Sequence, residues 1–436
     1  MDIRRFFRKS RILAFCIVAL VVLLNAAAWN STAFSDWYIT YIFPVWVNLY
    51  GRVTGFFPFS VGEWMLAAGV VLVVLALGIG MIWAGVGITM ALRSGLRQTV
   101  YRTKKMTKSV DAEGTGSGTG DGGKTKAMDA FRRFSRRFYR FFVYVLLIVS
   151  LVMTLNCFIL YHASTFSEHY FGEDEGEYTL VELIGIYNMV AERCNYFAQV
   201  IERDESGMAL YGGSVGAGGE LLDMADTARM LMRQLGETYP QLDGFYPRPK
   251  ALLSSDFMCQ QHMQGYYFPF SMEANYNDVM HILNIPSTMC HELAHLRGYI
   301  YEDEANFIGY LACVQSEDAF FQYAGYLSVL NYLNNDLYSA MKNNGASYEE
   351  AIKIIQPVVV DEQVWEDNIF VAQEEWDRIN GKALIDTEVV DKAADVFIDT
   401  NLKVNGVSDG AASYSRVVRL LLQYYRNSSG DRKTAG

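Results

Sequence analysis

Three long apolar stretches constrain this chain more than any other feature. They run over about residues 12–29, 64–92 and 141–161, and a helix needs about 20 such residues to span a bilayer. The first stretch holds no charge, and the second is apolar apart from its glycines and Thr89. Helices buried in a protein core usually keep a polar stripe, which these stretches lack. The sequence therefore predicts three transmembrane helices in an N-terminal membrane anchor, residues 1–161.

The distribution of charge predicts how the anchor is oriented. Residues 1–140 hold 19 Lys and Arg against 7 Asp and Glu, whereas the rest of the chain holds 18 against 41. Thirteen of the basic residues lie in a Gly-rich loop over 93–140, and only Arg52 lies between the first two stretches. The positive-inside rule places the N-terminus and this loop in the cytoplasm. We therefore expect a multi-pass protein of the cytoplasmic membrane with residues 162–436 extracytoplasmic.

The segment 162–436 is expected to fold as a mainly α domain with a small β-sheet. Thr179 and Glu182 form a capping box ahead of an apolar-periodic run, and similar runs cover 221–235, 320–337 and 417–425. The best strand candidate is 265–270, which Pro269 would confine to a sheet edge. The four cysteines of this segment have irregular spacings, so no pairing is assigned. Its acidic balance argues against nucleic acid as a partner.

The motif His291-Glu292-Leu293-Ala294-His295 is the most specific chemical signal. On a helix, His291 and His295 project from one face and can bind one Zn²⁺ ion. Glu292 is rotated by about 100° from His291, so it can take a proton from a water that the zinc activates. Ser287 or Thr288 is expected to cap this helix, and Gly298 to end it in a left-handed turn. The alternative is a pair of hydrogen-bonded histidines on a buried helix.

A catalytic zinc needs a third protein ligand. The downstream segment Glu302-Asp303-Glu304-Ala305-Asn306 resembles the E-x-x-A-D/N segment of gluzincin peptidases. That resemblance implies that Glu302 binds the metal, and Asn306, one turn on, is expected to steady a zinc-bound histidine. Glu304 points to the other side of the helix and is the weaker alternative. The H-x-x-G turn is similar to that of metzincins, but Tyr301 stands where their third histidine would be.

A wider likeness covers several motifs. The segments 267–270 (YFPF), 273–275 (EAN), 291–298 (HELAHLRG), 302–307 (EDEANF) and 413–416 (SYSR) together resemble an uncharacterised bacterial family of multi-span membrane proteins, domain of unknown function 3810. The likeness implies zincin-type metallopeptidase chemistry and names no substrate.

These features predict a membrane-anchored zinc metallopeptidase that acts on a peptide or protein substrate outside the cytoplasmic membrane. The segment 267–270 is a candidate edge strand for binding a peptide by strand addition, and Tyr414 or Arg416 is a weaker candidate for stabilising an oxyanion. One alternative keeps the zinc but hydrolyses another amide, such as a cell-wall peptide. The other is a non-catalytic, zinc-stabilised membrane sensor or assembly factor. The sequence leaves the substrate, the oligomeric state and the regulation open.

Overall fold

The computed structural model describes residues 3–106, 122–172, 178–212, 219–383, 385–404 and 414–434. It confirms a mainly α-helical chain, 75% helical, with a small three-stranded sheet. Three helices are long and apolar enough to cross a membrane, over Lys9–Asn30, Val61–Val86 and Met128–His162, which indicates a multi-pass membrane protein. The residues fall into two compact units. We call Met1–Leu20 with Trp64–Leu151 the anchor unit, and Val21–Glu63 with Val152–Gly436 the main unit.

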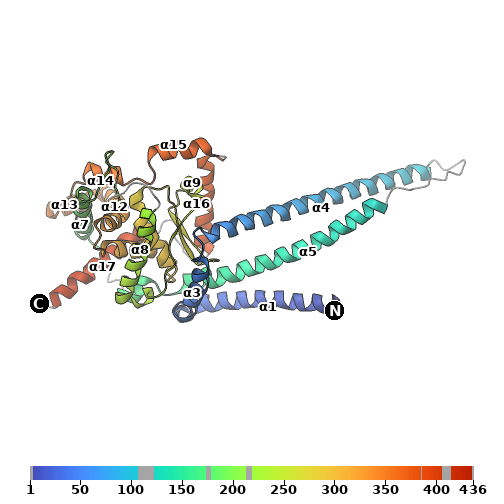
Figure 1. Cartoon of the computed structure of the whole chain (residues 1–436), viewed down its shortest axis with the longest axis horizontal. Helices are drawn as coiled ribbons and strands as arrows, with labels where there is room; N and C mark the ends of the chain where they lie inside the picture. The colour runs from blue at the N-terminus through green and yellow to red at the C-terminus, as the bar shows by residue number, and fades with distance from the viewer. Residues whose placement is uncertain are drawn as a thin grey trace. The chain divides into compact units, whose positions relative to one another are not determined.

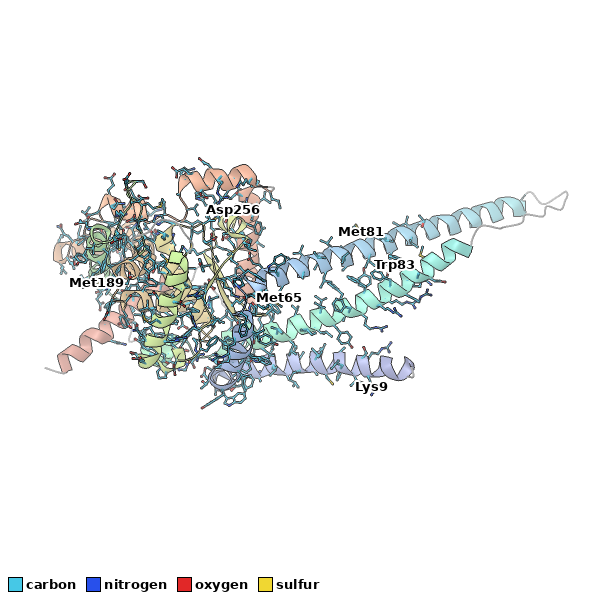
Figure 2. The ribbon with its side chains drawn as sticks, viewed as in Figure 1. Lys9, Met65, Met81, Trp83, Met189 and Asp256 are labelled. Atoms are coloured by element: carbon cyan, nitrogen blue, oxygen red, sulfur yellow. The ribbon has the colours of Figure 1, made fainter. Side chains whose placement is uncertain are left out.

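The anchor unit is built from most of three long helices, α1 (Ile3–Asn30), α4 (Val61–Met106) and α5 (Gly122–Met153). Polar contacts join them: the Tyr139 hydroxyl donates to the Ala76 carbonyl at 2.7 Å, the Ser10 and Tyr144 hydroxyls lie 2.6 Å apart, and the Tyr144 hydroxyl also contacts the Ser10 carbonyl. Ala76 and Ile79 are buried, but many of the apolar side chains face outward, as Met81 does on α4, where it is 70% exposed (Figure 2). Apolar helices with satisfied backbones and apolar outer faces suit a bilayer. The prediction of a loop over 93–140 is wrong for its described residues, because α4 continues to Met106 and α5 begins at Gly122. Residues 107–121, which hold most of the Gly-rich tract, lie outside the described residues.

The main unit has a helical core. Helix α10 (Ile285–His295) packs against α11 (Glu302–Val314), and α12 (Ala319–Asn343) lies against both and beside α7 (Figure 1). The predicted capping box is confirmed, because Thr179 and Glu182 close the start of α7 (Leu180–Val200). The other predicted helices are also confirmed and fall within α8 (Gly219–Thr238), α12 and α17 (Tyr414–Thr434). Amphipathic periodicity thus located the core helices correctly.

The sheet lies against one side of α10. Its strands are β1 (Lys250–Ala251), β2 (Gly265–Phe268) and β3 (Glu273–Tyr276), in the order β1-β3-β2. The central strand β3 runs parallel to β1 and antiparallel to β2, with Gly265 opposite Tyr276 and Phe268 opposite Glu273. The prediction of an edge strand is therefore confirmed, although the strand ends at Phe268 because Pro269 has no N–H for the ladder.

The segment between the first two apolar helices belongs to the main unit. It forms α2 (Thr32–Trp37), the π-helical turn η1 (Tyr38–Ile42) and α3 (Phe43–Thr54). A buried ion pair ties it to the sheet: the Lys250 ammonium lies 2.6 Å from a Glu273 carboxylate oxygen and donates to the carbonyls of Thr54 and Phe59. Glu273 in turn accepts the N–H groups of Val61 and Gly62, which begin α4. The start of the second apolar helix is thus fixed to the central strand.

The shorter elements complete the main unit, and all six cysteines are free. The helical ones are η2 (Thr154–Phe158), η3 (Leu160–His162), α6 (Phe166–Tyr170), η4 (Pro240–Leu242), α9 (Ser255–Gln260), η5 (Ile282–Asn284), α13 (Gly345–Ile354), α14 (Glu362–Asp367), α15 (Gln373–Lys382) and α16 (Thr387–Val404).

Candidate metal centre

The helix that carries the histidines begins differently from the prediction. Its N-cap residue is Asn284, which makes no side-chain cap, and Pro286 occupies the first turn, where a missing N–H costs nothing. The expected cap by Ser287 or Thr288 is therefore wrong. Both hydroxyls instead donate back to the Asn284 carbonyl, at 3.3 and 2.8 Å, as Ser and Thr commonly do inside a helix.

The turn that follows the helix is as predicted. Gly298 has a φ of +95°, in the region that favours glycine, and it redirects the chain from α10 into α11. A Cβ at this position would also lie 2.6 Å from Cγ2 of Ile39, in η1. The turn brings Glu302, Asp303 and Glu304 to the first turn of α11, where carboxylates interact favourably with the helix dipole.

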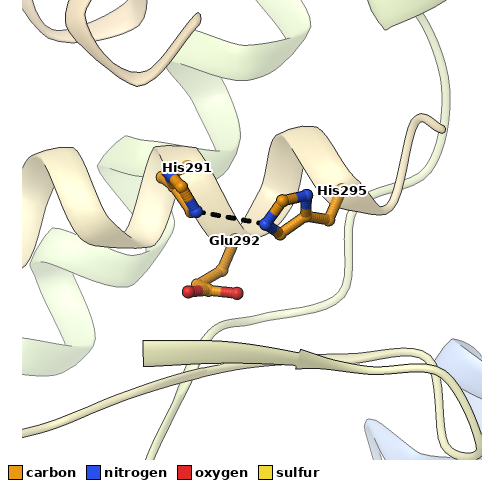
Figure 3. Close-up of side chains that lie close together, drawn as sticks. All are labelled: His291, Glu292 and His295. Atoms are coloured by element: carbon orange, nitrogen blue, oxygen red, sulfur yellow. Dashed lines mark hydrogen bonds between the residues drawn. The ribbon is translucent and has the colours of Figure 1, made fainter. Parts of the chain in front are cut away.

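The two imidazoles point their Nε2 atoms at one another. These atoms lie 3.1 Å apart (Figure 3). The Nδ1 atom of His291 lies 2.9 Å from Oδ1 of Asn306, and Nδ1 of His295 lies 2.7 Å from the carbonyl oxygen of Tyr299. Because both partners are acceptors, Nδ1 of each ring carries a proton, and in the neutral form of each ring Nε2 keeps its lone pair. Two lone pairs that face each other at this distance suit a shared cation.

Glu302 approaches the same point from α11. Its carboxylate oxygens lie 3.1 Å from Nε2 of His291 and 3.8 Å from Nε2 of His295. Tetrahedral zinc with N and O ligands at about 2.0–2.2 Å keeps its ligand atoms about 3.3 Å apart, so these three side chains fit the metal. The side chain of Glu302 is 49% exposed, so this residue borders solvent. Glu304, the weaker alternative, lies elsewhere: it is buried and accepts the N–H groups of Phe166 and Ser167 at the start of α6.

Glu292 is buried on the sheet side of α10 (Figure 3), only 3% exposed. One ligand atom of Glu292 lies within 4.8 Å of those of both histidines, but its Oε2 atom has no hydrogen-bond partner among the described residues. The other oxygen faces β2, since a Cβ at Gly265 would lie 2.7 Å from it. A buried polar atom without a partner is costly and uncommon in structural positions. This carboxyl is therefore placed to exchange a proton with something that binds beside the histidines.

The two carboxyl groups of the site have pKa values that are shifted in opposite directions. Burial is the main reason that the pKa of Glu292 rises to about 8, with Glu302 adding to it and His291 opposing it. Burial would also raise the pKa of Glu302, but the hydrogen bond from His291 and the positive charges of both rings lower it. Burial likewise lowers the pKa of His295, to about 4. Glu302 is thus held as an anion, and Glu292 can carry a proton near neutral pH.

One neighbour of the site carried no recognisable signal in the sequence. It is the carbonyl of Tyr299, because any residue type can present a backbone acceptor. Tyr267, the first residue of the predicted peptide-binding segment, also lies near the site: its ring centroid lies 6.1 Å from that of His295, and its hydroxyl donates to the Asn156 carbonyl at 3.1 Å. Arg416, one of the two predicted oxyanion candidates, is half-buried on α17, where burial raises the pKa of Asp303 and the charge of Arg416 opposes that effect.

Comparison with known proteins adds a family but no activity. No curated protein and no solved structure matches the chain. A family model matches residues 124–422, which include the third apolar helix, the sheet and all of the site described above. Its description assigns no reaction, ligand or partner. The chain therefore belongs to the family described as "Protein of unknown function (DUF3810)".

Proposed function

We propose that this protein is a membrane-anchored zinc metallopeptidase. The observation that carries the proposal is the convergence of two imidazole Nε2 atoms, 3.1 Å apart, with the Glu302 carboxylate, beside a buried Glu292 oxygen that lacks a partner. Two neutral histidines and a carboxylate are a common ligand set for catalytic zinc, and they leave one position open. A site that only stabilises the fold would more often be closed by a fourth protein ligand.

The side chains divide the work as follows. His291, His295 and Glu302 hold the ion, and Asn306 and the Tyr299 carbonyl orient the two rings through Nδ1. When bound, zinc supplies a Lewis acid that polarises a carbonyl and makes water more acidic. Oε2 of Glu292 accepts the proton of the attacking water and returns it to the leaving amine, a role that suits its raised pKa.

The edge strand suits a peptide substrate. Among the described residues β2 pairs only with β3, so its other edge is free to bind an extended chain by strand addition. Gly265, at the start of β2, faces Glu292. A peptide bound along β2 would therefore pass the carboxyl that moves the proton.

We also propose that the main unit lies outside the cytoplasm. Three crossings place residues 31–60 and the residues after 162 on one side of the membrane, and their packing in one compact unit supports this. The basic segment 93–140 then lies in the cytoplasm. A reporter that is active only in the cytoplasm, fused to the C-terminus, is expected to be silent, and its activity would overturn the orientation.

The central test is removal of the general base. Glu292→Gln is expected to retain zinc, because this residue is not one of the three ligands, and to lose about 10²- to 10⁴-fold in hydrolysis. The measurement is cleavage of a peptide library, with cell-wall peptides included, by the full chain in detergent, alongside zinc content. Glu317→Gln removes an exposed carboxylate in the connection between α11 and α12 and is the matched control, expected to cleave like the wild type.

Two results would contradict the proposal. Equal cleavage by the wild type and Glu292→Gln would place the activity elsewhere. Zinc bound to both proteins without cleavage of any substrate would favour the non-catalytic sensor or assembly factor.

A further inference from the structure

The segment between the first two apolar helices exposes an apolar stripe. Five apolar residues follow one another at four-residue spacing from the end of α2 through η1 and α3, and they are 49% to 65% exposed: Trp37, Tyr41, Val45, Leu49 and Val53. Side chains four apart lie on the same face of a helix. We call these five residues the apolar stripe. Such a contiguous exposed apolar surface is rare on the water-facing side of a protein and usually marks a binding surface.

The opposite face of the same helical segment supports the candidate metal centre. Ile39 is buried against the turn at Gly298, three residues after His295. The hydroxyl of Thr54 donates to the Ser271 carbonyl at 3.1 Å, in the turn that joins β2 to β3. One helix, about 10 Å across, therefore separates the apolar stripe from the elements that carry the site.

The chain itself indicates what covers the apolar stripe. Both ends of the segment continue into apolar helices, since the first ends at Asn30 and the second begins at Val61. Between residues 37 and 60 the only charged side chain is Arg52. The guanidinium of Arg52 lies over the ring of Phe245, 4.1 Å from its centroid. A helix joined at both ends to membrane spans, apolar on its outer side and almost uncharged, has the properties of an interfacial membrane helix.

The strand beside Glu292 also leads to the membrane helices. A Cβ at Gly62, in the first turn of α4, would lie 2.6 Å from the Phe268 ring at the end of β2. Asn156, in the last turns of the third apolar helix, donates from Nδ2 to the Pro269 carbonyl at 2.7 Å. The free edge of β2 therefore starts at the ends of two spans and runs from there toward Glu292.

We propose that the apolar stripe lies in the surface of the bilayer, and that the substrate is a membrane-proximal segment of another membrane-anchored polypeptide. The substrate class rests on the metallopeptidase function proposed above. A chain that emerges from the bilayer beside the spans meets the free edge of β2 at its Phe268 end. The site then receives segments within about 10–15 Å of the lipid, which an extended chain spans in about four residues.

The position of the apolar stripe is tested with nitroxide labels on the full chain in phosphatidylcholine–phosphatidylglycerol liposomes. Cys16→Ser removes the only exposed native thiol, and the labelled variants are Val45→Cys and Leu49→Cys. Val359→Cys, in the loop before α14 and 83% exposed, is the matched control. Labels on the stripe are expected to collide with oxygen in preference to a water-soluble nickel chelate, and the control label to do the reverse.

Two outcomes of the labelling would overturn this part of the proposal. Nickel accessibility on the stripe equal to that at Val359 would place the stripe in water. Labels that are immobile and shielded from both reagents would show that a protein surface covers it.

The substrate class is tested in the same liposomes with single-span test proteins. Each carries a randomised segment separated from the bilayer by a flexible spacer of about 4, 12 or 40 residues, and the same segments are also supplied as soluble peptides. Cleavage is expected to be fastest with the shortest spacer. Because effective concentration falls roughly as the −3/2 power of length, the longest should be cut about 30-fold more slowly. Glu292→Gln is run with each set.

The outcomes separate the two proposals. Cleavage of the long-spacer proteins but not the short-spacer ones would overturn the membrane-proximal substrate, and so would equal cleavage of tethered and soluble segments; both leave the peptidase function standing. No cleavage in any format, with zinc bound, would overturn the peptidase function, and the nitroxide labels would still decide where the stripe lies.

Discussion

Asn306 offers a quantitative test of how the metal centre is assembled. Its Oδ1 atom lies 2.9 Å from Nδ1 of His291 and fixes the ring so that Nε2 faces His295. Asn306→Ala removes that acceptor and leaves a largely buried N–H group without a partner, at a cost of about 1–3 kcal/mol. The His291 side chain is 12% exposed, so water replaces part of the lost bond. We therefore expect zinc affinity to fall about 10- to 30-fold, within the range known for such orienting residues.

The assay is competition for zinc between the full chain in detergent and a chromogenic chelator. Asn306→Asp keeps an acceptor in place and is expected to bind zinc at least as tightly as the wild type. Asn331→Ala removes an exposed asparagine from the surface pair with Asn368 and should leave the affinity unchanged. If Asn306→Asp were as weak as Asn306→Ala, packing rather than the hydrogen bond would explain the effect. Wild-type affinity in both would refute the role of Asn306.

Three further predictions concern the strand, the ion pair and the metal. Gly265→Ala is expected to slow hydrolysis about 10²-fold with zinc retained, because its Cβ would lie 2.7 Å from the general base and displace it. Lys250→Met should lower the free energy of unfolding by about 3–5 kcal/mol, measured as a fall in Tm, since it leaves the buried Glu273 carboxylate unpaired. Chelation of zinc should lower the Tm of the wild type but not that of His291→Ala, because only the former holds the ion.

Matched variants control the first two of these. Gly185→Ala adds a Cβ to a helix where nothing lies within 4 Å, and it should hydrolyse substrate normally. Arg378→Met breaks partly exposed ion pairs with Asp256 and Glu375 and should change the free energy of unfolding by no more than about 1 kcal/mol. Equal loss of stability in Arg378→Met and Lys250→Met would show that burial of the Lys250–Glu273 pair does not increase its contribution to the free energy of unfolding.

Local geometry explains which features could be predicted from the sequence. His291 and His295 lie one turn apart on one helix, so helix periodicity was enough to group them. Glu302 was assigned only through the resemblance to the gluzincin segment, and Asn306 through its position one helical turn after Glu302. The edge strand was predicted from the composition of residues 265–270 and from Pro269, which a sheet accepts only at its edge. The start of the helix was predicted wrongly because Ser287 looks like a capping residue in the sequence. In the structure its hydroxyl donates to the Asn284 carbonyl instead.

The rest depends on contacts between distant segments. Lys250 binds the carbonyl of Thr54, and Asn156 binds that of Pro269, across separations that no local pattern encodes. Backbone groups such as the Tyr299 carbonyl are invisible to any reading of side-chain types. The inclusion of residues 31–62 in the main unit was likewise beyond the sequence, because an apolar loop between two spans has the same composition whether or not it packs on a domain.

The hydrogen-bond partners of Glu273 impose an order on the synthesis and folding of the protein. Its carboxylate accepts hydrogen bonds from Lys250 and Ser271 and from the first two N–H groups of α4. Half of its donors therefore precede it by more than 200 residues in the chain and are synthesised first. During synthesis, β3 can reach its final state only after the first two helices have been inserted and residues 31–62 stand on the correct side. A copy that fails insertion would leave Glu273 short of donors next to the strand that borders Glu292. Assembly of the sheet beside the site is thereby coupled to insertion, and a chain that fails insertion is expected to lack the activity proposed above.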